Sequence, residues 1–250
     1  MTLAWNPEQY LKFGGPRTRA AMDLLARVPL AAPQEVVDLG CGPGNSTALL
    51  ADRWPSARIT GVDSSPEMLA AARAARPDLG WVQGDAAAWA PEAPVDLIFA
   101  NAVLQWVPDH GTLLPRLMAS LAPGGVLALQ MPTNHEAPAF RLLREVAGGE
   151  AKGDWRRPLA SEAYHRILAP HAAEVDLWET EYQQVMDGVD GILEWGKGTV
   201  LLPYLQDLGE ADRARFLADY RAALARAYPV QPDGRVLFPF KRLFVVARRA

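Results

Sequence analysis

Short apolar runs alternate with amphipathic segments over the first half of the chain. The runs are rich in Val, Ile and Leu and are bounded by Gly, Pro, Asp or Asn, which is typical of buried parallel strands. Because strands alternate with segments of helical spacing, the pattern predicts a parallel sheet flanked by helices. The predicted strands are 35–39, 58–63, 79–84, 95–100 and 126–131, and the predicted helices are 46–53, 66–76 and 111–121.

The pattern changes after Pro132, where helical segments dominate. Two late runs, 174–186 and 235–248, have strand character and extend the predicted sheet. Helical spacing returns between them, most clearly over 210–227. An insertion here can cover the ends of the strands, although ordinary core packing produces the same apolar stripe.

Composition narrows the class of protein. A chain of 250 residues, half of them apolar, can bury one large core, and we expect a single domain with an elaborated cap. A net charge of −4 with scattered Lys and Arg argues against a nucleic-acid groove or an anionic membrane surface. No leader pattern and no apolar stretch near the ~18 residues of a membrane span is present, so we expect a cytoplasmic protein. Cys41 is the only cysteine, which excludes an intrachain disulfide.

The first predicted strand contains an acid near its end and then breaks into three alternate glycines: Asp38 precedes Gly40, Gly42 and Gly44. Gly tolerates positive φ and carries no Cβ, so this turn can bring backbone N–H groups close to a ligand before a helix begins. The dinucleotide fingerprint reads G-x-G-x-x-G instead and receives a pyrophosphate, which an acid here would repel. The turn therefore indicates a pocket for a cationic ligand; a glycine turn over a buried Asp, without a ligand, is the alternative.

Polar residues also follow the other predicted strands. Asp63 lies 25 residues after Asp38, where an acid can accept both ribose hydroxyls. Asp85 ends the third strand, and Asn101 and Trp106 follow the fourth. The carboxyl ends of parallel strands meet at one edge of a sheet, so these residues predict one site. Taken singly, the two later acids could cap helices, Asn101 could make a turn and Trp106 could be core.

Residue sets for other chemistries are missing from the sequence. There is no evident Ser/His/Asp or Cys/His set for nucleophilic catalysis. The histidines at 110, 135, 165 and 171 contain no i, i+4 pair, so no metal site is predicted.

The sheet region from 36 to 131 resembles the class I methyltransferases that use S-adenosylmethionine. This resemblance implies a Rossmann-like, seven-stranded, mostly parallel sheet flanked by helices, with an antiparallel last strand and a helical cap over the carboxyl ends of the strands. It also implies one domain over 1–250, with an N-terminal helical lid at 1–30, a cofactor-binding half at 31–135 and a cap insertion at 189–230 between the last two strands. Further segments, 5–13, 38–47, 97–102, 104–106, 130–132, 204–208 and 242–247, are similar to the branch of the family that methylates trans-aconitate.

The implied cofactor is S-adenosylmethionine, and the residues expected to contact it lie in the glycine turn and around the strand ends. They are Asp38, Gly40, Cys41, Gly42, Gly44, Asn45, Asp63, Ser64, Met68, Asp85, Ala86, Asn101, Gln105 and Trp106.

The implied reaction is attack of a substrate carboxylate on the sulfonium methyl group. A carboxylate is already ionised at pH 7, so no general base and no catalytic side chain are expected. The protein has to place the two reactants in line and exclude water, which a closing lid and cap can do.

A small anionic acceptor needs cations or hydrogen-bond donors, and Arg suits carboxylates because its planar fork binds them in bidentate fashion. The substrate-binding candidates are Tyr10, Phe13, His110, Arg144, Lys197 and Arg242. Three other functions stay open: methylation of another small carboxylate, including a malonyl thioester on a carrier protein; a nicotinamide-dependent oxidoreductase, which the glycine spacing disfavours; and a non-catalytic S-adenosylmethionine-binding protein.

Overall fold

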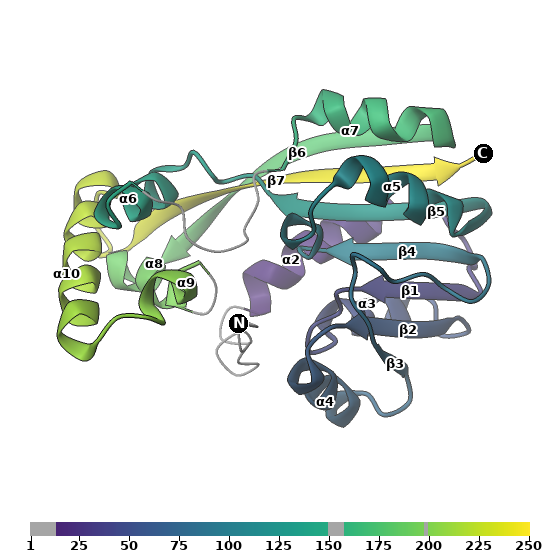
Figure 1. Ribbon diagram of the computed structural model, residues 1–250, viewed down its shortest axis with the longest axis horizontal. Helices are drawn as coiled ribbons and strands as arrows, with labels where there is room; N and C mark the ends of the chain where they lie inside the picture. Colours follow the sequence, from purple (N-terminus) through teal and green to yellow (C-terminus); the bar gives the residue numbers. More distant parts are fainter. Residues whose placement is uncertain (1–13, 150–157, 198–199) are drawn as a thin grey trace. The chain divides into compact units, whose positions relative to one another are not determined.

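A seven-stranded sheet with the order β3-β2-β1-β4-β5-β7-β6 organises the protein (Figure 1). The computed structural model describes residues 14–149, 158–197 and 200–250. Its strands are β1 (Glu35–Leu39), β2 (Arg58–Asp63), β3 (Gly80–Gln83), β4 (Val95–Asn101), β5 (Leu121–Pro132), β6 (Ala172–Met186) and β7 (Val236–Arg249).

The first five strands are parallel and are held in register by long-range pairing. Asp38 on β1 lies opposite Gly61 on β2 and Phe99 on β4. The chain runs outward from β1 through β2 to β3 and then returns to place β4 on the other side of β1. This reversal of strand order is where ligands bind in open α/β sheets, so it directs attention to the ends of β1 and β4.

Helices follow the strands as predicted for an alternating pattern. In the part of the chain up to β5 they are α2 (Gly14–Ala26), α3 (Asn45–Arg53), α4 (Pro66–Ala75), the 3-10 helix η1 (Leu104–Trp106) and α5 (His110–Ala119). Helix α3 packs on β1 and β2, α4 on β2 and β3, and α2 on α3 and β5. Ser65 caps α4 by accepting a hydrogen bond from the Met68 N–H, with Pro66 in the first helical position. Buried Leu, Val and Ile side chains from these elements form the core.

The second half of the chain alternates helices with the last two strands. Its helices are α6 (Pro138–Val146), α7 (Ser161–Leu168), the 3-10 helix η2 (Ala169–His171), α8 (Gly188–Lys197), α9 (Leu202–Leu205) and α10 (Glu210–Ala227). Strand β7 runs opposite to β5, as Figure 1 shows, which confirms the predicted antiparallel last strand. None of the helices that the structure describes is both long and apolar enough to cross a membrane.

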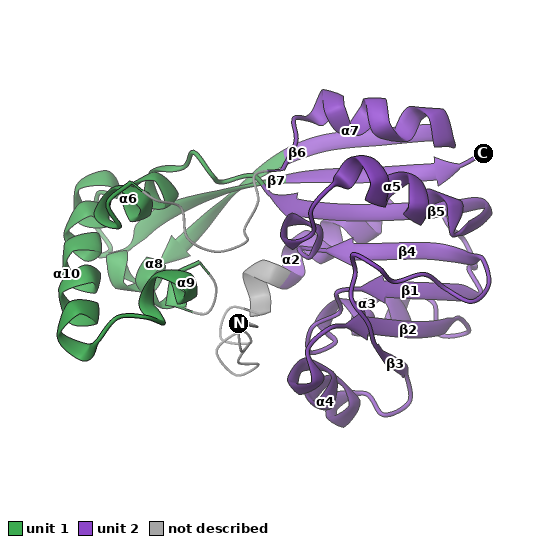
Figure 2. Cartoon of the chain, in the orientation of Figure 1, with its two compact units in different colours: residues 1–4, 133–157, 180–242 green, residues 5–132, 158–179, 243–250 purple. Residues whose placement is uncertain are grey.

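The described chain divides into two compact units (Figure 2). The sheet unit holds residues 14–132, 158–179 and 243–250, and the helical unit holds 133–149, 180–197 and 200–242. The core of the helical unit is aromatic: the ring centroids of Trp195 and Phe240 are 5.1 Å apart, and Phe140 and Tyr228 pack against the same cluster. Helices α8, α9 and α10 fall between β6 and β7 in the chain.

The predicted boundaries were wrong at one junction. Helix α5 ends at Ala119, and β5 already begins at Leu121, whereas the sequence suggested a helix to 121 and a strand from 126. At the start of β5, Leu121 pairs opposite Val95. The register then shifts, and regular pairing with β4 resumes at Val126, opposite Leu97. A glycine pair within this irregular stretch hides the strand pattern.

Candidate functional site

A tight turn connects β1 to α3 and forms the centre of the candidate site. Its three glycines all adopt positive φ, with values of 74° at Gly40, 54° at Gly42 and 91° at Gly44. Residues other than Gly rarely adopt this conformation, so the local sequence dictates the turn. The N–H groups of Gly40 and Cys41 donate to the Val62 carbonyl at 2.7 and 3.0 Å, which fastens the turn to β2.

The glycines have different neighbours. A Cβ at Gly40 would lie only 2.2 Å from the Val103 side chain, so this glycine makes room for the loop after β4. A Cβ at Gly42 would meet no atom within 4 Å. The sequence predicts that the glycines let a ligand approach the backbone. The open surroundings of Gly42 fit this prediction, whereas the Val103 side chain takes the space at Gly40.

Asp38 is a fully buried carboxyl group next to the turn. Its Oδ2 accepts hydrogen bonds from the hydroxyls of Ser46, at 2.7 Å, and Thr47, at 2.6 Å. Its Oδ1 is also buried and has no hydrogen-bond partner among the described residues. Burial raises the pKa of Asp38 to about 6, with a smaller raising contribution from Asp63, while the two hydroxyls lower it. A cation beside Oδ1 would relieve this cost.

Asp63 joins the ends of β1 and β2 through backbone N–H groups. Its Oδ2 accepts from the Gly42 N–H at 2.8 Å, and its Oδ1 accepts from the Ser65 N–H at 2.9 Å. Each carboxylate oxygen can accept two hydrogen bonds, so Asp63 retains capacity for further donors such as ribose hydroxyls. Asp63 also has the structural role that the sequence left open, because its hydrogen bond to the Ser65 N–H stabilises the start of α4.

At the end of β4, Asn101 and Gln105 are held by hydrogen bonds. Asn101 Oδ1 accepts from Gln130 Nε2 at 2.6 Å. Gln105 is buried, and its Nε2 donates to the Ala102 carbonyl at 2.7 Å while its Oε1 has no partner within the described chain. Ala102 between them has φ of 57°, a strained conformation for a residue with a Cβ. Strain of this kind is maintained where geometry serves a site.

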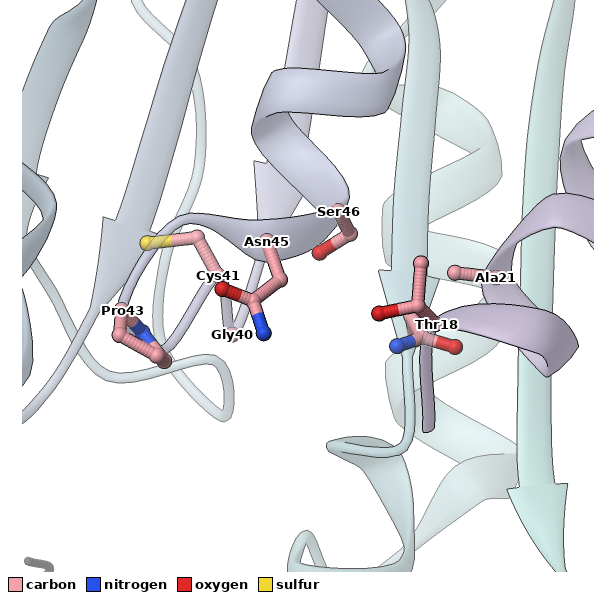
Figure 3. A pocket seen from close by; sticks show the side chains of 8 residues that line it. Thr18, Ala21, Gly40, Cys41, Pro43, Asn45 and Ser46 are labelled. Carbon is pink, nitrogen blue, oxygen red and sulfur yellow. The ribbon is translucent and has the colours of Figure 1, made fainter. Parts of the chain in front are cut away.

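A pocket opens beside the glycine turn, lined by Thr18, Ala21, Gly40, Cys41, Pro43, Asn45, Ser46 and Asn101 (Figure 3). Asn45 and Ser46 on the first turn of α3 face Thr18 and Ala21 on α2 across it. The predicted residues Gly40, Cys41, Asn45 and Asn101 are thus brought together. Asp38 does not line this pocket and lies behind Ser46, to which it is hydrogen-bonded.

Four lining residues were not among the predicted contacts: Thr18, Ala21, Pro43 and Ser46. Pro43 and Ser46 belong to the glycine segment, and the first-turn position of Ser46 beside the turn could have indicated its role. Thr18 and Ala21 come from α2. The packing of α2 on α3 is a tertiary contact, which a local sequence pattern does not predict.

The remaining predicted cofactor residues lie around the site without lining this pocket. Ser64 is exposed, Met68 is buried in α4, and Trp106 is half-buried on η1. Asp85 is exposed, and its Oδ1 accepts from the Ala87 N–H at 2.9 Å, while Ala86 is buried. Their assignment as cofactor contacts stays a prediction.

His110 is engaged in the core, which argues against the predicted substrate contact. Its Nδ1 lies 2.8 Å from the Tyr164 hydroxyl, and its Nε2 lies 2.9 Å from the Leu104 carbonyl. A carbonyl only accepts, so Nε2 carries a proton and Nδ1 accepts from Tyr164. Both ring nitrogens are therefore used, and the sequence could not reveal a partner on α7, 54 residues away.

The three basic candidates lie in the helical unit. Arg144 donates to the His135 carbonyl at 2.8 Å and approaches Glu136 at 3.7 Å. Lys197 is paired with Glu194. Arg242 is only 5% exposed, and its guanidinium lies over the Phe240 ring, 4.9 Å from the centroid. Tyr10 and Phe13 fall outside the described residues.

Other reactive groups do not suit nucleophilic or metal chemistry. Burial, with the nearby carboxyls of Asp38 and Asp63, raises the pKa of the Cys41 thiol, so it is not a ready nucleophile. Among the described residues, no three His, Cys, Asp or Glu side chains are grouped so that they could hold a metal ion.

Comparisons with known proteins show the family of this chain. Residues 36–125 match a family model described as a methyltransferase domain. The chain is 58% identical to a trans-aconitate 2-methyltransferase of Azoarcus sp., over 98% of this chain and 99% of that protein. It is also 55% identical to the enzyme of that name from Methylobacterium nodulans and 52% identical to that from Shigella dysenteriae, each over 98% of both chains. The chain belongs to the trans-aconitate 2-methyltransferase family.

Solved structures confirm the fold. The YcgJ protein from Bacillus subtilis aligns with a TM-score of 0.61 at 13% identity, over 92% of this chain and 98% of that one. Phosphoethanolamine N-methyltransferase 2 from Haemonchus contortus, solved with S-adenosylmethionine, aligns with a TM-score of 0.57 at 17% identity, over 93% of this chain and 53% of that one. The predicted Rossmann-like sheet is confirmed, and the family assignment makes S-adenosylmethionine the cofactor.

Proposed function

We propose that this protein transfers a methyl group from S-adenosylmethionine to a carboxylate of trans-aconitate, giving a monomethyl ester and S-adenosylhomocysteine. The observation that carries the proposal is the full-length identity of 52–58% to proteins named for this activity. The geometry adds a site of the right chemistry, because a buried acid and an open glycine turn lie together at the point where the strand order reverses.

The pocket residues fit the two charges of the amino-acid end of the cofactor. The N-cap of α3 is Gly44, which has no side chain to satisfy the first N–H groups of the helix, so those donors can serve a carboxylate. The Oδ1 of Asp38, which has no hydrogen-bond partner in the described part of the chain, attracts positive charge nearby. Asp63 retains acceptor capacity for the ribose hydroxyls. When bound, S-adenosylmethionine supplies an electrophilic methyl group on a sulfonium centre.

The chain has no need of a catalytic base for this reaction. A carboxylate acceptor is ionised at neutral pH. Two side chains that could have served other chemistry are committed elsewhere: the pKa of the Cys41 thiol is raised, and both nitrogens of His110 are hydrogen-bonded. The residues of the protein therefore bind, orient and exclude water, and correct placement alone can lower a barrier by ~7–11 kcal/mol.

The helical unit is the proposed source of the groups that bind the acceptor. Its helices α8, α9 and α10 form the insertion that the sequence predicts to cover the strand ends, and it carries the three basic candidates. A tricarboxylate brings about three negative charges, and burying them requires cations or donors. A unit that supplies these groups would bind the acceptor.

The test is transfer of labelled methyl from S-adenosylmethionine to a panel of acids, scored as base-labile ester. The panel holds trans-aconitate, cis-aconitate, citrate, isocitrate and a malonyl thioester on a carrier protein. We expect preferential labelling of trans-aconitate. Preferential labelling of the malonyl thioester would overturn the substrate, and binding of S-adenosylmethionine without any labelling would contradict the reaction.

A further inference from the structure

A single helical turn, residues 85–89, follows β3 and is termed here the β3 turn. The Asp85 carbonyl accepts hydrogen bonds from the Ala88 N–H at 3.0 Å and from the Trp89 N–H at 2.7 Å. The Asp85 side chain also accepts, through Oδ1, from the Ala87 N–H at 2.9 Å. Because the helix does not continue, the later carbonyls of the turn lack the N–H donors that a longer helix would supply.

Arg116 on α5 supplies the missing donors. Its Nη1 donates to the Trp89 carbonyl. Its Nη2 donates to the carbonyls of Ala87, at 2.7 Å, and Ala86, at 3.4 Å. The donors of a guanidinium are fixed in one plane, so one side chain both satisfies the three oxygens and sets their relative positions. Arg116 and the β3 turn belong to the same sheet unit.

Apolar packing anchors the β3 turn independently of Arg116. Ala86 is buried in the core, and the half-buried Trp89 packs against the same core. Asp85 and Ala87 are exposed. The turn would therefore stay attached to the sheet unit without the guanidinium, while the position of the exposed Asp85 carboxylate depends on how the main chain of the turn is held.

The β3 turn begins next to Asp63. Gln83, the last residue of β3, lies opposite Asp63 in the sheet, and the Gly84 N–H donates to the Asp63 carbonyl at 3.0 Å. In S-adenosylmethionine the ribose joins the base to the amino-acid end. Under the proposed function the amino-acid end lies beside the glycine turn and the ribose at Asp63, so the adenine extends toward β3, the next strand outward.

The 6-amino group of adenine is a hydrogen-bond donor, and the exposed Asp85 carboxylate retains acceptor capacity beyond its bond to the Ala87 N–H. We propose that Arg116 is a positioning residue for the cofactor: its guanidinium holds the β3 turn so that Asp85 accepts a hydrogen bond from the adenine 6-amino group. The inference rests on the proposed function for the cofactor and not for the acceptor.

The experiment compares the binding of S-adenosylhomocysteine and S-inosylhomocysteine to the full-length protein by calorimetric titration. Inosine carries an oxygen in place of the 6-amino group, so a carboxylate at this position rejects it. The ratio of the two Kd values measures recognition of the amino group, and a general loss of stability does not change this ratio. The test variants are Arg116→Gln, Arg116→Lys and Asp85→Asn.

Arg53→Gln is the matched control. Arg53 also donates to main-chain carbonyls, those of Leu25 and Val28, and it belongs to the same sheet unit. It lies at the end of α3 opposite to the end that meets the glycine turn. The variant removes a comparable structural guanidinium without touching the β3 turn.

We expect the parent protein to prefer S-adenosylhomocysteine over S-inosylhomocysteine by about tenfold or more, as a hydrogen bond to a charged group allows. Asp85→Asn should reduce the preference to about twofold, since an amide can donate to the inosine oxygen. Arg116→Gln should reduce it to about threefold, and Arg116→Lys should give an intermediate value because an ammonium group lacks the planar fork. Arg53→Gln should lower the melting temperature and keep the full preference.

A full preference in Arg116→Gln, together with its loss in Asp85→Asn, overturns the inference, because Arg116 would then serve stability alone. Equal losses in Arg116→Gln and Arg53→Gln overturn it as well, as does a parent protein that does not discriminate between the two ligands. If Arg116→Gln does not fold, Arg116→Lys decides: a reduced preference supports the inference, and an unchanged one overturns it.

Failure of the proposed function has a different signature. If the parent protein binds S-adenosylhomocysteine but labels no trans-aconitate, the acceptor assignment falls, while loss of the adenine preference in Arg116→Gln still supports the positioning role. If the parent protein does not bind S-adenosylhomocysteine, the cofactor assignment falls and the inference falls with it.

Discussion

At the scale of single residues, Asp38 couples the stability of the protein to its ligand. A carboxyl group whose folded pKa is raised to about 6 holds its proton more tightly in the folded state than in the unfolded chain, where the pKa is about 3.9. Its contribution to stability is fully present below pH ~4 and is lost as the pH rises through about 6. By pH 7 the buried charge costs about 3 kcal/mol.

Asp38→Asn should therefore stabilise the free protein while it weakens cofactor binding. An amide keeps an oxygen for Ser46 and Thr47 but carries no charge. We expect the free energy of unfolding to rise by ~1–2 kcal/mol at pH 8 and to change little at pH 4, measured by urea denaturation of variant and parent at both pH values. The Kd for S-adenosylmethionine should rise at least tenfold. A stability difference that does not depend on pH would contradict the assigned cost.

The glycine turn offers a second comparison between single residues. Gly40→Ala places a Cβ against Val103, so we expect a loss of ~2–4 kcal/mol in the free energy of unfolding. Gly42→Ala meets open space and bears only the cost of positive φ, about 1–2 kcal/mol, but its methyl group enters the room left for a ligand. Thermal unfolding and calorimetric titration with S-adenosylhomocysteine separate the two effects. Equal stability loss in both variants would refute the distinction.

At the scale of elements, a buried hydrogen-bond chain holds the loop after β4. The Tyr164 hydroxyl on α7 serves His110 on α5, which in turn serves the Leu104 carbonyl on η1, and the Leu159 N–H donates to the same hydroxyl at 3.2 Å. Burial raises the pKa of Tyr164 to about 12, so the hydroxyl stays protonated and available as a donor at physiological pH. Two helices thereby fix the element that carries Gln105.

Tyr164→Phe should loosen this loop. The change leaves His110 Nδ1 buried without a donor, and we expect a loss of ~1–3 kcal/mol in stability together with a several-fold weaker affinity for S-adenosylhomocysteine. Tyr220→Phe is the matched control, since Tyr220 donates to the Ala139 carbonyl within the helical unit. It should lower the melting temperature without altering affinity for S-adenosylhomocysteine. The same effect of both variants on that affinity would rule out a specific role for the chain.

Elements are also the scale at which the sequence is most informative. Strands such as β1 and β2 could be predicted to the residue because they are buried on both faces and end in acids or glycines, and the meeting of their ends follows from parallel topology. The start of β5 was missed because its irregular stretch lacks the pattern. Partners such as Tyr164 for His110 and α2 for α3 depend on packing between distant segments, which periodicity does not encode.

At the scale of the whole molecule, the two units divide the ligands between them under the proposals made above. The glycine turn and Asp63 belong to the sheet unit, whereas the basic candidates Arg144, Lys197 and Arg242 belong to the helical unit. A ligand stabilises the segments that it contacts against local opening, and binding at ten times Kd can slow their amide exchange about tenfold. Hydrogen exchange can therefore measure the protection of each unit separately in the intact protein.

We expect S-adenosylhomocysteine alone to protect residues 38–48 and 61–65. Addition of trans-aconitate should extend the protection into the helical unit, because the proposed function assigns binding of the acceptor to cationic groups of that unit. Protection by trans-aconitate that stays within the sheet unit would place its carboxylates elsewhere, and the helical unit would then act on the reaction only by excluding water.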